Sequence, residues 1–93
     1  MTIALEKAAH TLQISPEQLW QESLRAYVSR EKRLTRMDIA DLQDRYGVSD
    51  PQELTKRIKA GEIYSHPAWE DSIEWENLLA HIERLDLLYA PVS

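Results

Sequence analysis

The sequence contains no cysteine, no phenylalanine and only two glycines among its 93 residues. Without cysteine, the chain can form neither a disulfide framework nor a thiolate metal site. No apolar run approaches the roughly 20 residues of a membrane-spanning helix, and the N-terminus lacks the charged and then apolar pattern of a signal peptide. We therefore expect a protein without a membrane segment that is located in the cytoplasm.

Stretches in which Val, Ile or Thr alternate with polar residues are also scarce, which argues against a β-sheet of any size. We expect an all-α fold with a long central helix, short flanking helices and a long C-terminal helix, extended rather than compact. The length allows one domain with a small core.

The central helix is predicted between Ser15 and Gly47, because nothing between its start and stop signals breaks it. Ser15 is suited to the N-cap and Pro16 to the first helical position, while Gly47 is a typical stop. The helix would be about 46 Å long, whereas a compact chain of this size has a radius of gyration of about 12 Å. Its apolar face therefore needs cover from other helices, a second copy or another protein.

The apolar face of this long helix is the predicted dimer contact. Glu31 and Asp38 interrupt it, and we place them at the edge of the contact, with pairing to nearby Arg and Lys side chains as the alternative. The residues expected to form the dimer are Trp20, Leu24, Tyr27, Val28, Leu34 and Leu42.

Charge is distributed unevenly along the chain. Residues 1–60 carry ten Lys and Arg against nine Asp and Glu, and residues 61–93 carry one against seven. A basic belt on the long helix comprises Arg25, Arg30, Lys32, Arg33 and Arg36. Such a belt could neutralise several phosphates of DNA or RNA, but a solvated helix face has the same pattern, so nucleic-acid binding is possible and not favoured.

Short helices are predicted on either side of the long one. Residues 3–13 form an amphipathic helix that folds back on its start, and a second short helix opens at Asp50 and Pro51 and stops at Gly61. Residues 1–60 then form a helical dimerisation part and residues 61–93 an acidic partner-binding part of one domain.

The last helix, from Pro67 to about Tyr89, has two apolar faces. One can serve the core, and the other is a candidate partner surface in which aromatic side chains are ringed by carboxylates. Trp75 could belong to either. The predicted partner-binding residues are Trp69, Glu70, Asp71, Ile73, Glu74, Trp75, Glu76 and Leu87.

Catalysis and metal binding are not indicated. Glu70 and Glu74 are four residues apart, but His81 and Glu83 lack the spacing of a zinc site. There is no glycine-rich phosphate loop and no nucleophile with an evident base. We expect no enzyme activity, no catalytic or metal-binding residues and no cofactor.

Four stretches of the sequence carry a resemblance to a known family. The two helices of ribbon-helix-helix proteins resemble residues 5–9, Leu-Glu-Lys-Ala-Ala, and residues 14–27, which run from Ile-Ser-Pro-Glu-Gln-Leu to Leu-Arg-Ala-Tyr. This pattern is found in small acidic antitoxins of prokaryotic type II toxin-antitoxin modules. Residues 44–48 and 66–76 are similar to short antitoxin-like proteins of bacteria and archaea. The DNA-reading strand of that family has no counterpart before the first helix, where only residues 1–4 are available.

The resemblance implies an antitoxin that neutralises a cognate basic toxin, expected to be a ribonuclease, by protein contact. It leaves autorepression in doubt, because the strand is missing. Two alternatives remain open, namely a helical dimeric adaptor or scaffold protein and a small nucleic-acid-binding regulator that uses the basic belt.

Overall fold

The computed structural model describes residues 2–88 and consists of four helices. They are α1 (Thr2–Leu12), α2 (Pro16–Tyr46), α3 (Pro51–Lys59) and α4 (Ser65–Leu88). No strand occurs within residues 2–88, so the predicted all-α class is confirmed. Tyr89, where the last helix was expected to end, lies outside the described residues.

The ends of α2 follow the local signals in the sequence. The Ser15 hydroxyl accepts a hydrogen bond from the Gln18 backbone N–H at 3.0 Å, and Pro16 occupies the first turn. Gly47 has φ of 64°, the left-handed conformation that glycine tolerates best, and its N–H reaches the Gln43 carbonyl at 2.8 Å. The predicted single helix between Ser15 and Gly47 is confirmed.

The starts of α3 and α4 are also determined by residues close to them in the sequence. The Asp50 carboxylate accepts a hydrogen bond from the Glu53 N–H at 2.7 Å, and the Glu53 carboxylate accepts one from the Ser49 N–H at 3.3 Å. His66 has non-helical φ and ψ values, so the regular part of α4 begins after it, as Pro67 at the first position predicts.

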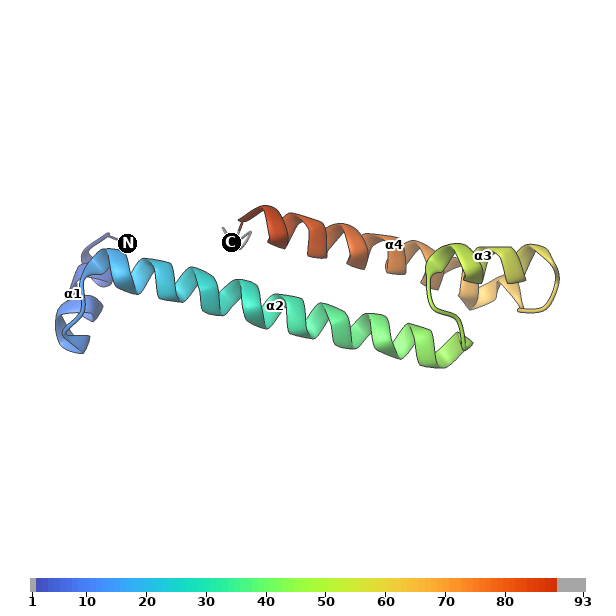
Figure 1. The fold of residues 1–93 in the computed structure, drawn as a ribbon, viewed down its shortest axis with the longest axis horizontal. Coiled ribbons are helices and arrows are strands. Elements are labelled where there is room, and N and C mark those ends of the chain that lie inside the picture. The colour runs from blue at the N-terminus through green and yellow to red at the C-terminus, as the bar shows by residue number, and fades with distance from the viewer. Residues whose placement is uncertain (1, 89–93) are drawn as a thin grey trace.

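The helices form an open hairpin and not a globule. Figure 1 shows α4 running back antiparallel to α2, with α1 folded against the start of α2 and α3 at the opposite end. The Cα radius of gyration is 19.2 Å and the principal extents are 60 × 27 × 18 Å, against a radius of about 12 Å for a compact chain of this length. The expected extended shape is confirmed.

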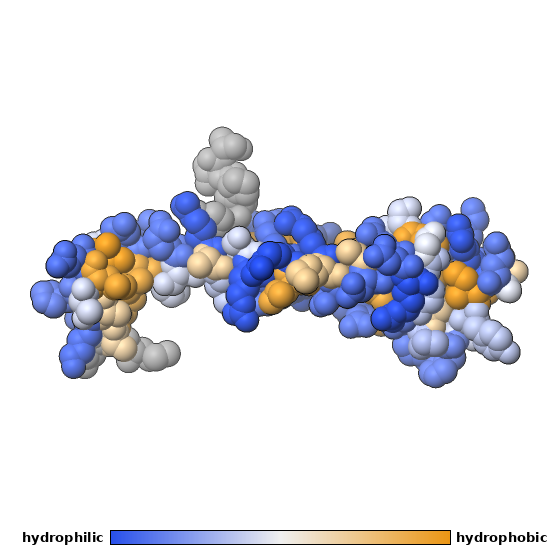
Figure 2. All heavy atoms as spheres, turned by 90° about the horizontal axis from the view of Figure 1, so that it is seen from below, coloured by the Kyte–Doolittle hydropathy of each residue, from blue (hydrophilic) through white to orange (hydrophobic). Residues whose placement is uncertain are grey.

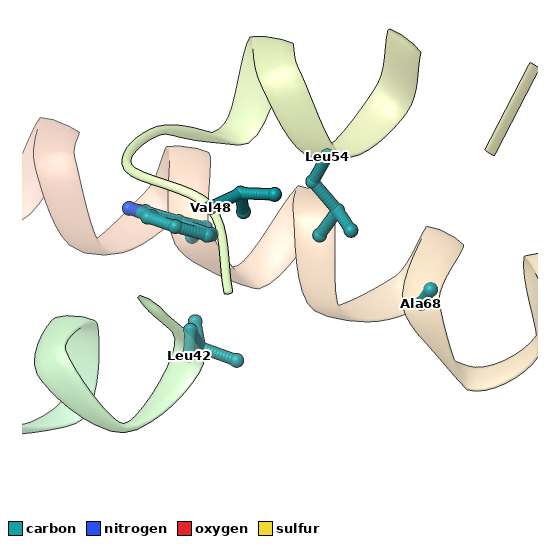
Figure 3. Packing of buried hydrophobic residues seen from close by; sticks show 5 residues of the cluster. Leu42, Val48, Leu54 and Ala68 are labelled. Atoms are coloured by element: carbon teal, nitrogen blue, oxygen red, sulfur yellow. The ribbon is translucent and has the colours of Figure 1, made fainter. Parts of the chain in front are cut away.

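The main core lies where α2, α3 and α4 meet. Figure 3 shows Leu42 of α2, Val48 of the connecting loop, Leu54 of α3 and Ala68 of α4 directed towards one another. Trp75 of α4 completes this cluster and is only 1% exposed. Outside this cluster, Val28 and Thr35 of α2 and Leu85 of α4 are also buried.

Trp75 is therefore a core residue, and its assignment to the partner surface was wrong. The sequence places Trp69 and Trp75 six residues apart, so their side chains project about 120° apart around α4. Trp75 faces the cluster, whereas Trp69 is 45% exposed.

Replacing Trp75 with alanine is expected to lower the free energy of unfolding by about 3 to 5 kcal/mol, because it opens a large cavity in the main core. Urea unfolding followed by circular dichroism measures this loss. Trp69→Ala is the matched control and is expected to change stability by no more than about 0.5 kcal/mol. Equal losses for both tryptophans would contradict this division of roles.

Candidate functional site

The outer face of α4 is the main candidate surface. It is defined by Trp69, Ile73 and Leu87, which are 45%, 51% and 84% exposed, respectively, and by the exposed carboxylates Glu70 and Glu76. The opposite side of the helix packs on α2 and α3 through its buried residues. The prediction that the last helix has one core face and one uncovered face is confirmed.

Glu70 lies at the start of this outer face and is held in its charged form. The His66 ring nitrogen Nδ1 lies 3.1 Å from the Glu70 carboxylate. A backbone N–H hydrogen bond and, to a smaller extent, the His66 contact keep the pKa of the Glu70 carboxyl below its usual value. Glu70 therefore keeps its negative charge to a lower pH than an unperturbed glutamate would.

Asp71 does not belong to this outer face, although the sequence placed it there. Its carboxylate accepts hydrogen bonds from the Arg45 guanidinium, at 2.9 Å, and from the Tyr46 hydroxyl. Only 14% of the Asp71 side chain is exposed. The residue ties the C-terminal end of α2 to α4, which gives it a structural role that the sequence did not predict, and its part in partner binding stays a prediction.

The contact with Asp71 shifts the pKa values of both donors, Arg45 and Tyr46. Burial, followed by the hydrogen bond to Asp71, raises the pKa of the Tyr46 hydroxyl. The hydrogen bond to Asp71 also raises the pKa of the Arg45 guanidinium. Both shifts favour the protonated donors that the contact requires.

The remaining predicted carboxylates differ in their surroundings. Glu74 is exposed and lines a cleft between α2 and α4 of about 170 Å³, together with Asp38, Asp41 and Arg45. Glu76 is exposed but accepts a hydrogen bond from the Gln52 side chain of α3 at 2.9 Å.

The predicted dimer residues fall into two groups. Val28 and Leu42 are buried within the chain, so these two positions do not offer the exposed side chains that the predicted dimer contact requires, whereas Leu24 is half-buried. Trp20, Tyr27 and Leu34 are exposed. Figure 2 shows hydrophobic side chains on this side of the molecule near the end that carries α1 and again midway along α2, with hydrophilic side chains between them.

The basic belt is also divided. Arg25, Arg30, Arg33 and Arg36 are exposed. Lys32 forms a salt bridge with Asp86 of α4, and its side chain is only 18% exposed. The preceding residue of α2, Glu31, lies 3.5 Å from the His81 ring of α4 and so takes part in the α2–α4 contact within the chain, whereas its predicted place at the edge of a dimer contact stays a prediction.

Residues 2–88 contain no group of three or more His, Asp and Glu side chains arranged to hold a metal ion. None of the helices in this part of the chain is both long enough and apolar enough to cross a membrane.

Sequence reasoning missed Arg45 and Tyr46 as the residues that hold Asp71. The contacts span 26 and 25 positions in the chain, and no local pattern marks such a distant partner.

A family model described as the uncharacterized protein MJ0235 family matches residues 1–89, and the chain therefore belongs to that family. No curated protein and no solved structure matches the chain. The description of the family names no activity, so the antitoxin hypothesis stays a prediction.

Replacing Tyr46 with phenylalanine is expected to lower the free energy of unfolding by about 1.5 to 3 kcal/mol, because a half-buried carboxylate loses a donor. Urea unfolding at neutral pH measures the loss. Tyr27→Phe, at an exposed position of the same helix, is the matched control and should leave stability unchanged. A Tyr46→Phe protein as stable as the wild type would show that the contact with Asp71 contributes nothing net.

The stabilising effect of the Tyr46 hydroxyl should also depend on pH. Because the folded-state pKa lies above the unfolded value of about 10, the contribution is complete below about pH 10 and is lost as pH rises through the folded pKa. The difference in unfolding free energy between wild type and Tyr46→Phe should therefore shrink in alkaline solution. A difference that stays constant or grows there would contradict the raised pKa.

Proposed function

We propose that this member of the MJ0235 family is a binding protein without enzyme activity that docks a basic protein through the outer face of α4. The observation that carries the proposal is the coincidence of exposed apolar side chains and carboxylates on one helix face. Trp69 and Ile73 are exposed there beside Glu70 and Glu76, and Leu87 is exposed about 16 Å further along the helix.

The chemistry of the outer face suits a protein partner. A half-exposed indole can enter a pocket on a partner and contribute a large apolar area to binding. Surrounding carboxylates favour encounter with a positively charged surface and disfavour an acidic one. Residues 61–93 supply this charge, since they carry seven Asp and Glu against one Arg.

An antitoxin that neutralises a basic toxin is the specific form of this function that we propose. It rests on the resemblance of residues 5–9, 14–27, 44–48 and 66–76 to ribbon-helix-helix and antitoxin-like proteins. In this form, the outer face of α4 would cover a basic surface of a ribonuclease. A helical adaptor that uses the same face without neutralising a toxin is the alternative.

Nucleic-acid binding remains a weaker proposal. Arg30, Arg33 and Arg36 are exposed and could contact phosphates. However, Lys32 already pairs with Asp86, and residues 2–88 contain no strand that could serve as a DNA-reading ribbon.

Trp69→Ala is expected to weaken binding of the basic partner by about 2 kcal/mol or more, roughly thirtyfold in Kd, while the protein stays folded. The partner is the protein that immobilised wild-type protein retains and the immobilised Trp69→Ala protein does not. Mass spectrometry identifies it. Direct titration of the purified pair then gives both dissociation constants. Binding should weaken as salt is raised, because the carboxylates contribute to it.

Tyr64→Ala supplies the control for this experiment, since it removes another highly exposed aromatic residue that lies outside α4. It should leave binding unchanged. A partner that binds Trp69→Ala and wild type equally well would contradict the proposed surface. Co-expression with the product of the adjacent gene tests the antitoxin form, which fails if that product neither arrests growth nor binds the protein.

A further inference from the structure

A second exposed strip runs along α2, away from the outer face of α4. Its members are separated by alternating steps of three and four residues, the spacing of a coiled-coil seam. The outer strip of α2 comprises Tyr27, Arg30, Leu34, Met37, Asp41 and Asp44, all of them exposed.

This strip is distinct from the surface that α4 covers. Tyr27, Leu34 and Asp41 each precede a buried residue, namely Val28, Thr35 and Leu42. Since consecutive residues of a helix point about 100° apart, the outer strip is turned about 100° from the α4 contact. Another helix can lie along it without displacing α4.

We propose that a second copy of this chain packs antiparallel on the outer strip, with a twofold axis between residues 35 and 36. This register places Leu34 opposite Met37 of the second copy, and Met37 opposite Leu34 of the second copy. These four apolar side chains form the centre of the contact. Arg30 then faces Asp41 of the second copy on both sides of the centre. Tyr27 faces Asp44 one step further out, where its hydroxyl can donate to the carboxylate.

Charge complementarity fixes the direction of the pair. In a parallel pair in register, Arg30 would face Arg30 of the second copy, and Asp41 and Asp44 would likewise face their own counterparts. Repulsion between these like charges disfavours the parallel arrangement. The antiparallel register converts those contacts into pairs of opposite charge. The strip is therefore complementary to itself in one direction only.

The cleft between α2 and α4 supports the same register. Asp41 lies at this cleft with Asp38 and Glu74, and the one basic residue that lines it, Arg45, is already bonded to Asp71. Arg30 of the second copy arrives beside Asp41 and offsets this excess of carboxylates. The second copy thus supplies positive charge where the described chain has a surplus of negative charge.

The overlap is long enough for a stable contact. In this register, residues 25–46 of the two copies lie side by side over about 33 Å. The dimer uses α2 alone and leaves the outer face of α4 open. Failure of the dimer would therefore leave the proposed binding of a basic partner untouched.

Charge reversal at the paired positions tests the proposal. Wild type, Arg30→Asp, Asp41→Arg and the double variant are compared by sedimentation equilibrium, with circular dichroism to confirm helix content. Each single reversal should weaken the dimer at least about tenfold, because each dimer contains the pair twice. The double variant restores opposite charges and should recover most of the affinity.

Arg36→Asp is the matched control, since it reverses an exposed charge of α2 outside the outer strip and should leave the dimer intact. A wild-type protein that is monomeric at tens of micromolar would overturn the proposal. So would single reversals without effect, or a well-folded double variant that stays monomeric.

A distance measurement tests the direction independently. Because the chain has no cysteine, Glu22→Cys provides a single site for a spin label. Antiparallel pairing about residues 35 and 36 separates the two labels by about 40 Å along the helices, whereas parallel pairing leaves them about 10 to 20 Å apart. A short distance would overturn the antiparallel register.

Discussion

The length of α2 is the constraint on which the rest of the structure depends. Its 31 residues span about 46 Å, and no other helix within residues 2–88 can cover that distance. α4 has 24 residues and packs along α2 from the end near α3, while α1 covers only the start. The chain therefore forms an open hairpin with a small core at one end, and much of α2 keeps an exposed flank.

Helix boundaries could be predicted because their causes are local. Ser15, Gly47 and Asp50 act on backbone groups within four residues of themselves, so the sequence alone contains the information. The orientation of α4 could not be predicted in the same way. Spacing separates Trp69 from Trp75, but it does not decide which of them faces α2, because that depends on how Leu42, Val48 and Leu54 pack from other parts of the chain.

The acidity of the C-terminal segment illustrates a second limit of sequence reasoning. Counting carboxylates treats them as equivalent, yet Asp71 and Asp86 hold α4 to α2 through Arg45 and Lys32. The partners lie far apart in the chain, and only the packed helices bring them together. Some of the opposite charges of the two segments therefore pair with one another within the fold, where they hold α4 alongside α2.

The exposed surfaces of the two long helices, α2 and α4, differ in their charges. The outer face of α4 presents carboxylates of one sign around Trp69, whereas the outer strip of α2 alternates Arg30 with Asp41 and Asp44 around Leu34 and Met37. A surface of one sign cannot pair with a copy of itself without repulsion and so suits a different, basic protein. A surface of mixed sign can pair with its own copy, provided that the two helices run in opposite directions. This division of charge between the helices is the reason why we propose two kinds of partner for the two surfaces.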